Sequence, residues 1–138
     1  MAMIWMLDTN IMIWFVNRKP GFEQIARRMS GRSPGELRIS AITLAELRFG
    51  IENGEFRAAN RRALAEVLQL FQADDLPSAA SQDFGEIKKA LVRKGKLIGP
   101  YDMLIAAHAR YLGATVVTDN ESEFRRVPGL KVQNWLVA

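Results

Sequence analysis

The sequence contains no cysteine and a single histidine, His108. The lack of cysteine excludes disulfides, thiolate nucleophiles and cysteine-based zinc sites, and it is consistent with a reducing compartment. No apolar run approaches the roughly 18 residues that a membrane span requires, and the N-terminus MAMIWMLDTN lacks the basic and apolar regions of a secretory signal. We therefore expect a cytoplasmic protein with no membrane partner.

Signatures of several common enzyme classes are also missing. The sequence has neither a GxxxxGK[ST] nor a GxGxxG segment. It has no serine in a nucleophile-elbow context to accompany His108, which argues against a Ser-His-Asp triad. His108 lies six positions after Asp102 in a predicted helix, so the two side chains are on different sides of that helix. We interpret His108 as a packed, hydrogen-bonded residue rather than a ligand.

The composition is typical of one globular domain. The length of 138 residues suits a single domain, and 49% hydrophobic with 25% charged residues distinguishes the chain from a disordered one. Lys and Arg number 19 against 15 Asp and Glu, a net charge of +4. A basic surface around a local acidic pocket suits a polyanionic substrate that meets a bound cation. A basic balance is also common among small soluble proteins.

Short apolar strands alternate with helices along the chain, and this order predicts an α/β fold with a parallel sheet covered on both faces. The strands are predicted at 4–7, 37–40, 75–77, 114–118 and 130–132. The helices are predicted at 11–16, 22–29, 43–53, 56–71, 78–94, 102–112 and 121–124, with Thr9 or Asn10 capping the first.

Acidic residues stand where predicted strands end or helices begin, namely Asp8, Glu46, Asp102 and Asp119. A parallel sheet brings these positions to one edge, where ligands bind. A cluster of carboxylate oxygens in a chain without cysteine favours a hard cation such as Mg²⁺ or Mn²⁺. Helix capping is the simpler alternative for three of them, because Thr43 to Glu46 matches a capping box and Asp102 and Asp119 precede helical segments.

Asp8 is harder to explain as a cap, because it ends an apolar strand in the best-buried part of the predicted sheet. A buried charge is costly unless it is paired or bound to a metal, and carboxylates about 5 Å apart repel by about 3 kcal/mol at an effective dielectric of about 20. Polar neighbours at the same edge can orient the carboxylates or ordered waters. These neighbours are Thr9, Asn10, Thr118 and Asn120. Either Asp119 or Asn120 fills a fourth inner position, because only one of them can point inward from the strand end.

Four segments carry a resemblance to a known family: MLDTNI (6–11), SAITLAELRFG (40–50), GPYDMLIAAHAR (99–110) and VVTDNESEFRRVPGLKVQNW (116–135). They run in family order with family-like spacing and cover nearly the whole chain. In these segments the chain resembles PIN-domain proteins, specifically VapC-type toxins of bacterial toxin–antitoxin pairs. The resemblance implies a three-layer α/β/α PIN-like domain over residues 1–138 with a central, mostly parallel sheet.

The resemblance also implies an activity and partners. The expected activity is a Mg²⁺- or Mn²⁺-dependent endoribonuclease that cleaves RNA, with tRNA as the expected substrate. A VapB-type antitoxin is the expected inhibitor, and a homodimer is expected. By position, Asp8, Glu46 and Asp102 match the family's catalytic, metal-binding acids. Thr118 and Asn120 match a Thr-x-Asp or Thr-x-Asn pattern, and Asp119 falls on its variable position.

The predicted roles follow from metal-assisted hydrolysis. Asp8 and Asp102 are expected to hold the metal directly, with Glu46 as a ligand or a water-positioning base. The alternative is a catalytically silent binding module whose acidic pocket recognises a basic partner. A signalling receiver domain fits poorly, because such domains need an acidic pair after the first strand and Asp8 is followed by Thr9.

Overall fold

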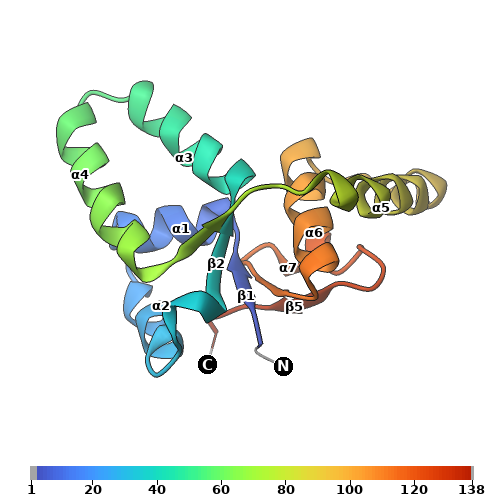
Figure 1. Cartoon of the computed structure of the whole chain (residues 1–138), viewed down its shortest axis with the longest axis horizontal. Coiled ribbons are helices and arrows are strands. Elements are labelled where there is room, and N and C mark those ends of the chain that lie inside the picture. Colours follow the sequence, from blue (N-terminus) through green and yellow to red (C-terminus); the bar gives the residue numbers. More distant parts are fainter. Residues whose placement is uncertain (1–2, 138) are drawn as a thin grey trace.

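The computed structural model describes residues 3–137 and contains a parallel sheet between layers of helices (Figure 1). The five strands lie in the order β3-β2-β1-β4-β5, and every neighbouring pair is parallel. The predicted α/β architecture is therefore confirmed, and the sheet is parallel throughout. The strands are β1 (Trp5–Leu7), β2 (Leu37–Ser40), β3 (Gln72–Asp74), β4 (Thr115–Val117) and β5 (Lys131–Gln133).

The helices follow the predicted order. They are α1 (Thr9–Val16), α2 (Phe22–Met29), α3 (Ala41–Glu52), α4 (Arg57–Val67), α5 (Ser81–Lys94), α6 (Pro100–Leu112) and α7 (Glu121–Phe124), with short 3-10 turns η1 (Pro34–Glu36), η2 (Leu68–Leu70) and η3 (Ser78–Ala80). Among the helices formed by residues 3–137, none combines the length and apolar character needed to cross a membrane.

Successive residues of each strand face opposite layers, which divides the core in two. Leu7 and Val117 pack with side chains of α1, α2, α3 and α4. Met6 and Val116 pack on the other face with side chains of α5, α6 and α7. The central strand β1 is apolar and buried at every position, because both of its faces are covered by helices.

The path of the chain through the sheet locates the candidate site. From β1 the chain proceeds outward to β2 and β3, and it then returns to the opposite side of β1 to form β4. Ligands of open α/β sheets bind at such a reversal, beyond the carboxyl ends of the strands. Asp8 directly follows β1, and Thr118 directly follows β4. The fold therefore brings two of the sequence-predicted residues to its natural ligand-binding crevice.

Several boundaries differ from prediction: α4 ends at Val67 rather than 71, α5 begins at Ser81 rather than 78, α6 begins at Pro100 rather than 102, and β1, β4 and β5 shift by one residue. Three further differences have a local reason. The edge strand β3 is Gln72–Asp74 rather than 75–77, because Asp74 lies beside Ser40 in the ladder and pairs with Arg38 at 2.9 Å. Helix α3 begins at Ala41 rather than Thr43, because the Ser40 hydroxyl accepts a hydrogen bond from the Ile42 amide. Helix α1 begins at Thr9 because Asp8, rather than Thr9 or Asn10, caps it.

Candidate active site

Asp8 lies at the centre of the candidate site, between the ends of β1 and β4. Its side chain is 2% exposed. Oδ1 accepts a hydrogen bond from the Ile11 amide at 3.0 Å, which caps α1, and Oδ2 accepts one from Thr118 Oγ1 at 2.6 Å. Each oxygen retains a lone pair, so Asp8 is fixed in position and still able to bind another group.

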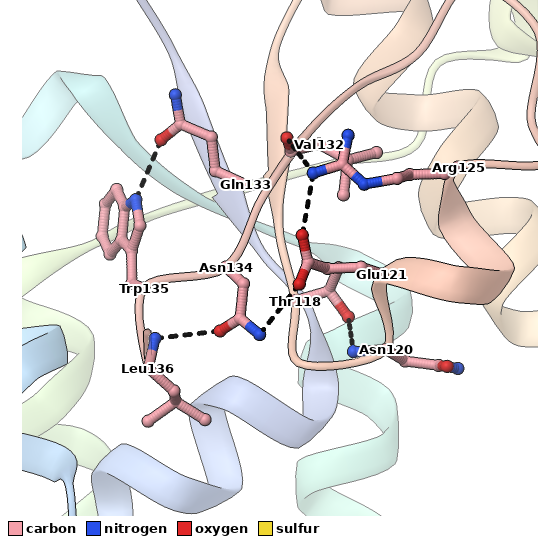
Figure 2. Close-up of polar contacts among 9 residues, drawn as sticks. All are labelled: Thr118, Asn120, Glu121, Arg125, Val132, Gln133, Asn134, Trp135 and Leu136. Atoms are coloured by element: carbon pink, nitrogen blue, oxygen red, sulfur yellow. Dashed lines mark hydrogen bonds and ion pairs between the residues drawn. The ribbon is translucent and has the colours of Figure 1, made fainter. Parts of the chain in front are cut away.

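Thr118 is held in turn by the loop that follows it. Its hydroxyl accepts a hydrogen bond from the Asn120 amide at 2.9 Å, which Figure 2 shows, and so directs its proton toward Asp8. Farther along, the Asn134 side chain after β5 donates to Glu121 of α7 at 3.3 Å (Figure 2). The loop between β4 and α7 is therefore tied to the sheet edge, and this fixes the partner of Asp8.

Glu46 enters the site from the second turn of α3. Its Oε1 accepts a hydrogen bond from Thr9 Oγ1 at 2.6 Å, across α1 and α3. Thr9 Oγ1 also lies 3.3 Å from the hydroxyl of Thr43, which is fully buried. The predicted capping box at Thr43 was wrong: both side chains of that pair serve a polar cluster with Thr9 instead.

Asp102 lies in the first turn of α6, where it is partly buried. The residue that caps this helix is Gly99, and α6 has no side-chain cap, so Asp102 is not a capping residue. Burial raises the pKa of Asp102 to about 6, and the charges of Glu46 and Glu123 contribute. The carboxylates of three helices are thus close enough to influence one another.

The same coupling extends to Asp8. Burial raises the pKa of Asp8 to about 7, with smaller contributions from Asp119 and Asp102, against the hydrogen bonds from Thr118 and Ile11 that lower it. Burial disfavours the charged form of a carboxyl group, and so do like charges. Strongly shifted acids in a crevice are typical of functional sites.

The fourth acidic position differs from expectation. Asp119 is exposed, and the Asn120 side chain donates to Glu123 Oε2 at 2.7 Å rather than to Asp8 or Asp102. Glu123, on α7, is a second acid besides Glu46 whose charge raises the pKa of Asp102. The sequence analysis missed Glu123, although an acid one turn beyond a strand end is a signal that could have identified it. Asn10, also predicted at this edge, is exposed.

A pocket adjoins Glu46 between α1, α3 and α4. Its volume is about 220 Å³. The lining is mostly apolar and includes Ile13, Leu47 and Leu64, with Glu46 as its only charged residue. The carboxylate therefore borders a space that can admit a group of modest size.

The donor set suits a hard divalent cation, although it is not arranged as a finished cage. Within residues 3–137 no three His, Asp or Glu side chains form a group that could hold a metal ion as positioned. Hydrogen bonds from Thr118 and Thr9 direct Asp8 and Glu46 toward hydroxyls. Carboxylate oxygens are nevertheless the donors that Mg²⁺ and Mn²⁺ prefer, and burial raises the pKa of Asp8 and of Asp102, with neighbouring negative charges contributing.

His108 lies outside the acidic cluster, as expected. It is fully buried in α6, and its Nδ1 lies 2.8 Å from the hydroxyl of Ser40. Burial lowers the pKa of His108, which keeps the ring neutral. The interpretation of His108 as a packed, hydrogen-bonded residue is confirmed.

Comparisons with known proteins agree with this geometry. Residues 5–130 match the PIN domain family. Ribonuclease VapC2 of Haemophilus influenzae is 39% identical over 132 residues, covering 96% of this chain and 98% of the relative. The tRNA(fMet)-specific endonuclease VapC of Shigella flexneri is 36% identical over 131 residues, covering 95% and 97%. A chain in the crystal structure of DNA-bound VapBC from Salmonella typhimurium aligns with a TM-score of 0.90 at 36% identity, covering 97% of this chain and 99% of that one.

The parallel sheet with carboxylates at its reversal point is a PIN domain, and the chain belongs to the PIN domain family. Within that family it belongs with the VapC ribonucleases, because identity of 36 to 39% extends over nearly the whole chain. The resemblance identified from the sequence is therefore confirmed.

Proposed function

We propose that this protein is a metal-dependent endoribonuclease, the toxin of a type II toxin–antitoxin pair, with tRNA as its substrate. As a member of the VapC group it is an endoribonuclease toxin. Support for tRNA comes from the Shigella flexneri relative, which is named for tRNA(fMet). The binding-module alternative is not favoured, because the relatives are named as nucleases.

One observation carries the catalytic proposal. Asp8 is buried at the reversal point of the sheet, held by Thr118 and coupled in charge to Asp102. In this proposal Asp8 and Asp102 hold a Mg²⁺ or Mn²⁺ ion. When bound, such an ion polarises a phosphate oxygen and acidifies a water molecule. The role of the protein is to keep both carboxylates in place before RNA arrives.

Glu46 is proposed to act on the attacking water. Thr9 occupies Glu46 Oε1, so Oε2 is the oxygen free to accept a proton. The hydrogen bond from Thr9 also fixes the orientation of the carboxylate. Attack by water on the phosphorus breaks the P–O3′ bond; the departing 3′ oxygen takes up a proton, which leaves a 3′-hydroxyl on one product and a 5′-phosphate on the other.

The proposed partners are a VapB-type antitoxin and a second copy of the chain. Support for the antitoxin comes from similar solved structures, which are VapBC complexes from Salmonella typhimurium and Rickettsia felis. The homodimer is proposed on family resemblance alone. Light scattering of the purified protein, with and without the co-expressed antitoxin, measures both stoichiometries.

RNA cleavage by the purified, antitoxin-free protein tests the catalytic proposal. We expect cleavage of bulk tRNA that EDTA abolishes, that Mn²⁺ restores, and that Asp8→Asn reduces by at least 100-fold. Glu66→Gln, a loss of one exposed charge on α4, is the matched control and should cleave normally. Cleavage that survives both EDTA and Asp8→Asn would eliminate the metal-dependent mechanism.

A further inference from the structure

Basic residues are concentrated on the C-terminal half of α5 and in the loop that follows it. They are Lys88, Lys89, Arg93, Lys94 and Lys96, and we refer to them as the α5 basic cluster. All five are exposed. Lys89 and Arg93 are four positions apart and therefore share one face of the helix.

The cluster is not neutralised by the helix that carries it. Both acids of α5, Asp83 and Glu86, are paired with Arg110 of α6, Asp83 at 2.7 Å. Among the ion pairs formed by residues 3–137, none includes a member of the α5 basic cluster. Cations in the last turn of a helix stabilise it through the macrodipole. That explains Arg93 and Lys94, whereas Lys88, Lys89 and Lys96 lie outside the last turn.

The cluster lies at the same end of the molecule as the candidate active site. Helices α5 and α6 pack side by side, and only residues 95–99 connect the end of α5 to the start of α6, which carries Asp102. A sixth cation adjoins this loop, because Arg126 donates to the Leu97 carbonyl at 3.4 Å. Arg126 follows α7, the helix of Glu123. A short loop therefore joins the end of the cluster to the helix that carries Asp102.

An exposed aromatic ring lies between the cluster and the carboxylates. Tyr101, next to Asp102, is 59% exposed. Exposed aromatic rings beside basic residues are a common platform for unpaired bases. This combination favours a nucleic acid as the ligand, because its bases can stack on the exposed ring. An acidic protein segment would need only the basic residues.

We propose that the α5 basic cluster binds the phosphates of the RNA strand that flanks the scissile bond. The inference rests on the proposed ribonuclease function and adds a substrate requirement to it. The RNA must extend beyond the cleaved bond far enough to reach α5. Contacts of this kind position the strand without reading its sequence. They also release counterions, so that affinity falls with salt concentration.

The test compares two double charge reversals. Lys89→Glu/Arg93→Glu alters the cluster, and Arg27→Glu/Arg28→Glu makes the same change in net charge on exposed positions of α2. Binding of fluorescently labelled bulk tRNA is measured in EDTA from about 50 to 200 mM salt. Loss of two phosphate contacts should lower the steepness of log affinity against log salt concentration by about 1.4 to 1.8. At about 0.1 M salt this corresponds to a loss of affinity of roughly 25- to 60-fold. The α2 variant should remain within about threefold of wild type.

Kinetics and partner binding complete the test. For cleavage of tRNA in Mn²⁺, the α5 variant should raise KM far more than it lowers kcat. Lys89→Gln/Arg93→Gln, which loses the same two contacts without adding negative charge, should lower the salt slope by a similar amount and guards against misfolding. Equal losses of tRNA affinity in the α2 and α5 variants would overturn the inference. An α5 variant that loses antitoxin binding but keeps its tRNA affinity would overturn it as well. If the wild type cleaves no RNA, the proposed function fails, a result separable from these.

Discussion

Thr118 Oγ1 donates a hydrogen bond to Asp8 Oδ2 at 2.6 Å, which joins residues 110 positions apart in sequence at the reversal point of the sheet. The bond favours the charged carboxylate and lowers the pKa of Asp8. In Thr118→Val the pKa of Asp8 should rise by about one pH unit, since a hydrogen bond to a charged group contributes about 1.5–3 kcal/mol. Carboxyl NMR titration of the metal-free protein measures it. In Thr118→Ser, which keeps the hydroxyl, the pKa of Asp8 should equal that of wild type. An unchanged pKa of Asp8 in Thr118→Val would show that the hydrogen bond does not lower it.

The raised pKa of Asp8 predicts how stability depends on pH. The folded chain keeps the Asp8 proton up to its raised pKa of about 7, whereas the unfolded chain loses it near the ordinary pKa of 3.8. The folded state therefore binds more protons between these limits, and its stability falls as pH rises through this window. Asp8→Asn removes this dependence. The unfolding free energy of the variant, relative to that of wild type at the same pH, should therefore rise by roughly 4 kcal/mol between pH 4 and pH 8.

Urea denaturation in EDTA across that pH range checks this prediction. Comparing each variant with wild type at the same pH cancels the opposite contribution of His108, whose pKa is lowered by burial. Glu66→Gln should show a difference from wild type that is constant with pH. A constant difference for Asp8→Asn would mean that Asp8 is ionised throughout.

The fourth acidic position can be decided by substitution. Glu123 acts on Asp102 and is bound by Asn120. We expect Glu123→Gln to lower RNA cleavage by about 10- to 100-fold, the usual loss for a group that orients a metal site. Glu66→Gln, the exposed control on α4, should remain within about twofold. A larger loss in Asp119→Asn than in Glu123→Gln would restore Asp119 as the fourth acid.

Ser40 is predicted to be more important for stability than its size suggests. Its hydroxyl caps α3 through the Ile42 amide at 3.1 Å and contacts His108 Nδ1 at 2.8 Å, fully buried. Ser40→Ala removes a cap and leaves a buried ring nitrogen unpaired, at a combined cost of about 2–4 kcal/mol in unfolding free energy. Urea denaturation measures the loss. Ser122→Ala, at an exposed helical position, should change stability by no more than about 0.5 kcal/mol.

The limits of the sequence analysis have physical causes. The apolar run before Asp8 and the β-branched run before Thr118 were sufficient to place both residues at one sheet edge, because strand polarity is set by the βα alternation. Local patterns do not specify which polar side chain caps a helix, so the sequence analysis missed Asp8 as the cap of α1 and Ser40 as the cap of α3. Glu123 was missed for a related reason: α7 has only one turn, and its orientation depends on Asn120 and Asn134 rather than on its own periodicity.

The position of β4 beside β1 has a consequence for synthesis on the ribosome. β1 is translated first and is the middle strand of the sheet, yet one of its two neighbours consists of residues 115–117. A nascent chain that has not yet emerged beyond Thr118 lacks both that neighbour and the hydroxyl that holds Asp8. The growing polypeptide therefore lacks the complete candidate site until the residues of β4 and Thr118 have been translated.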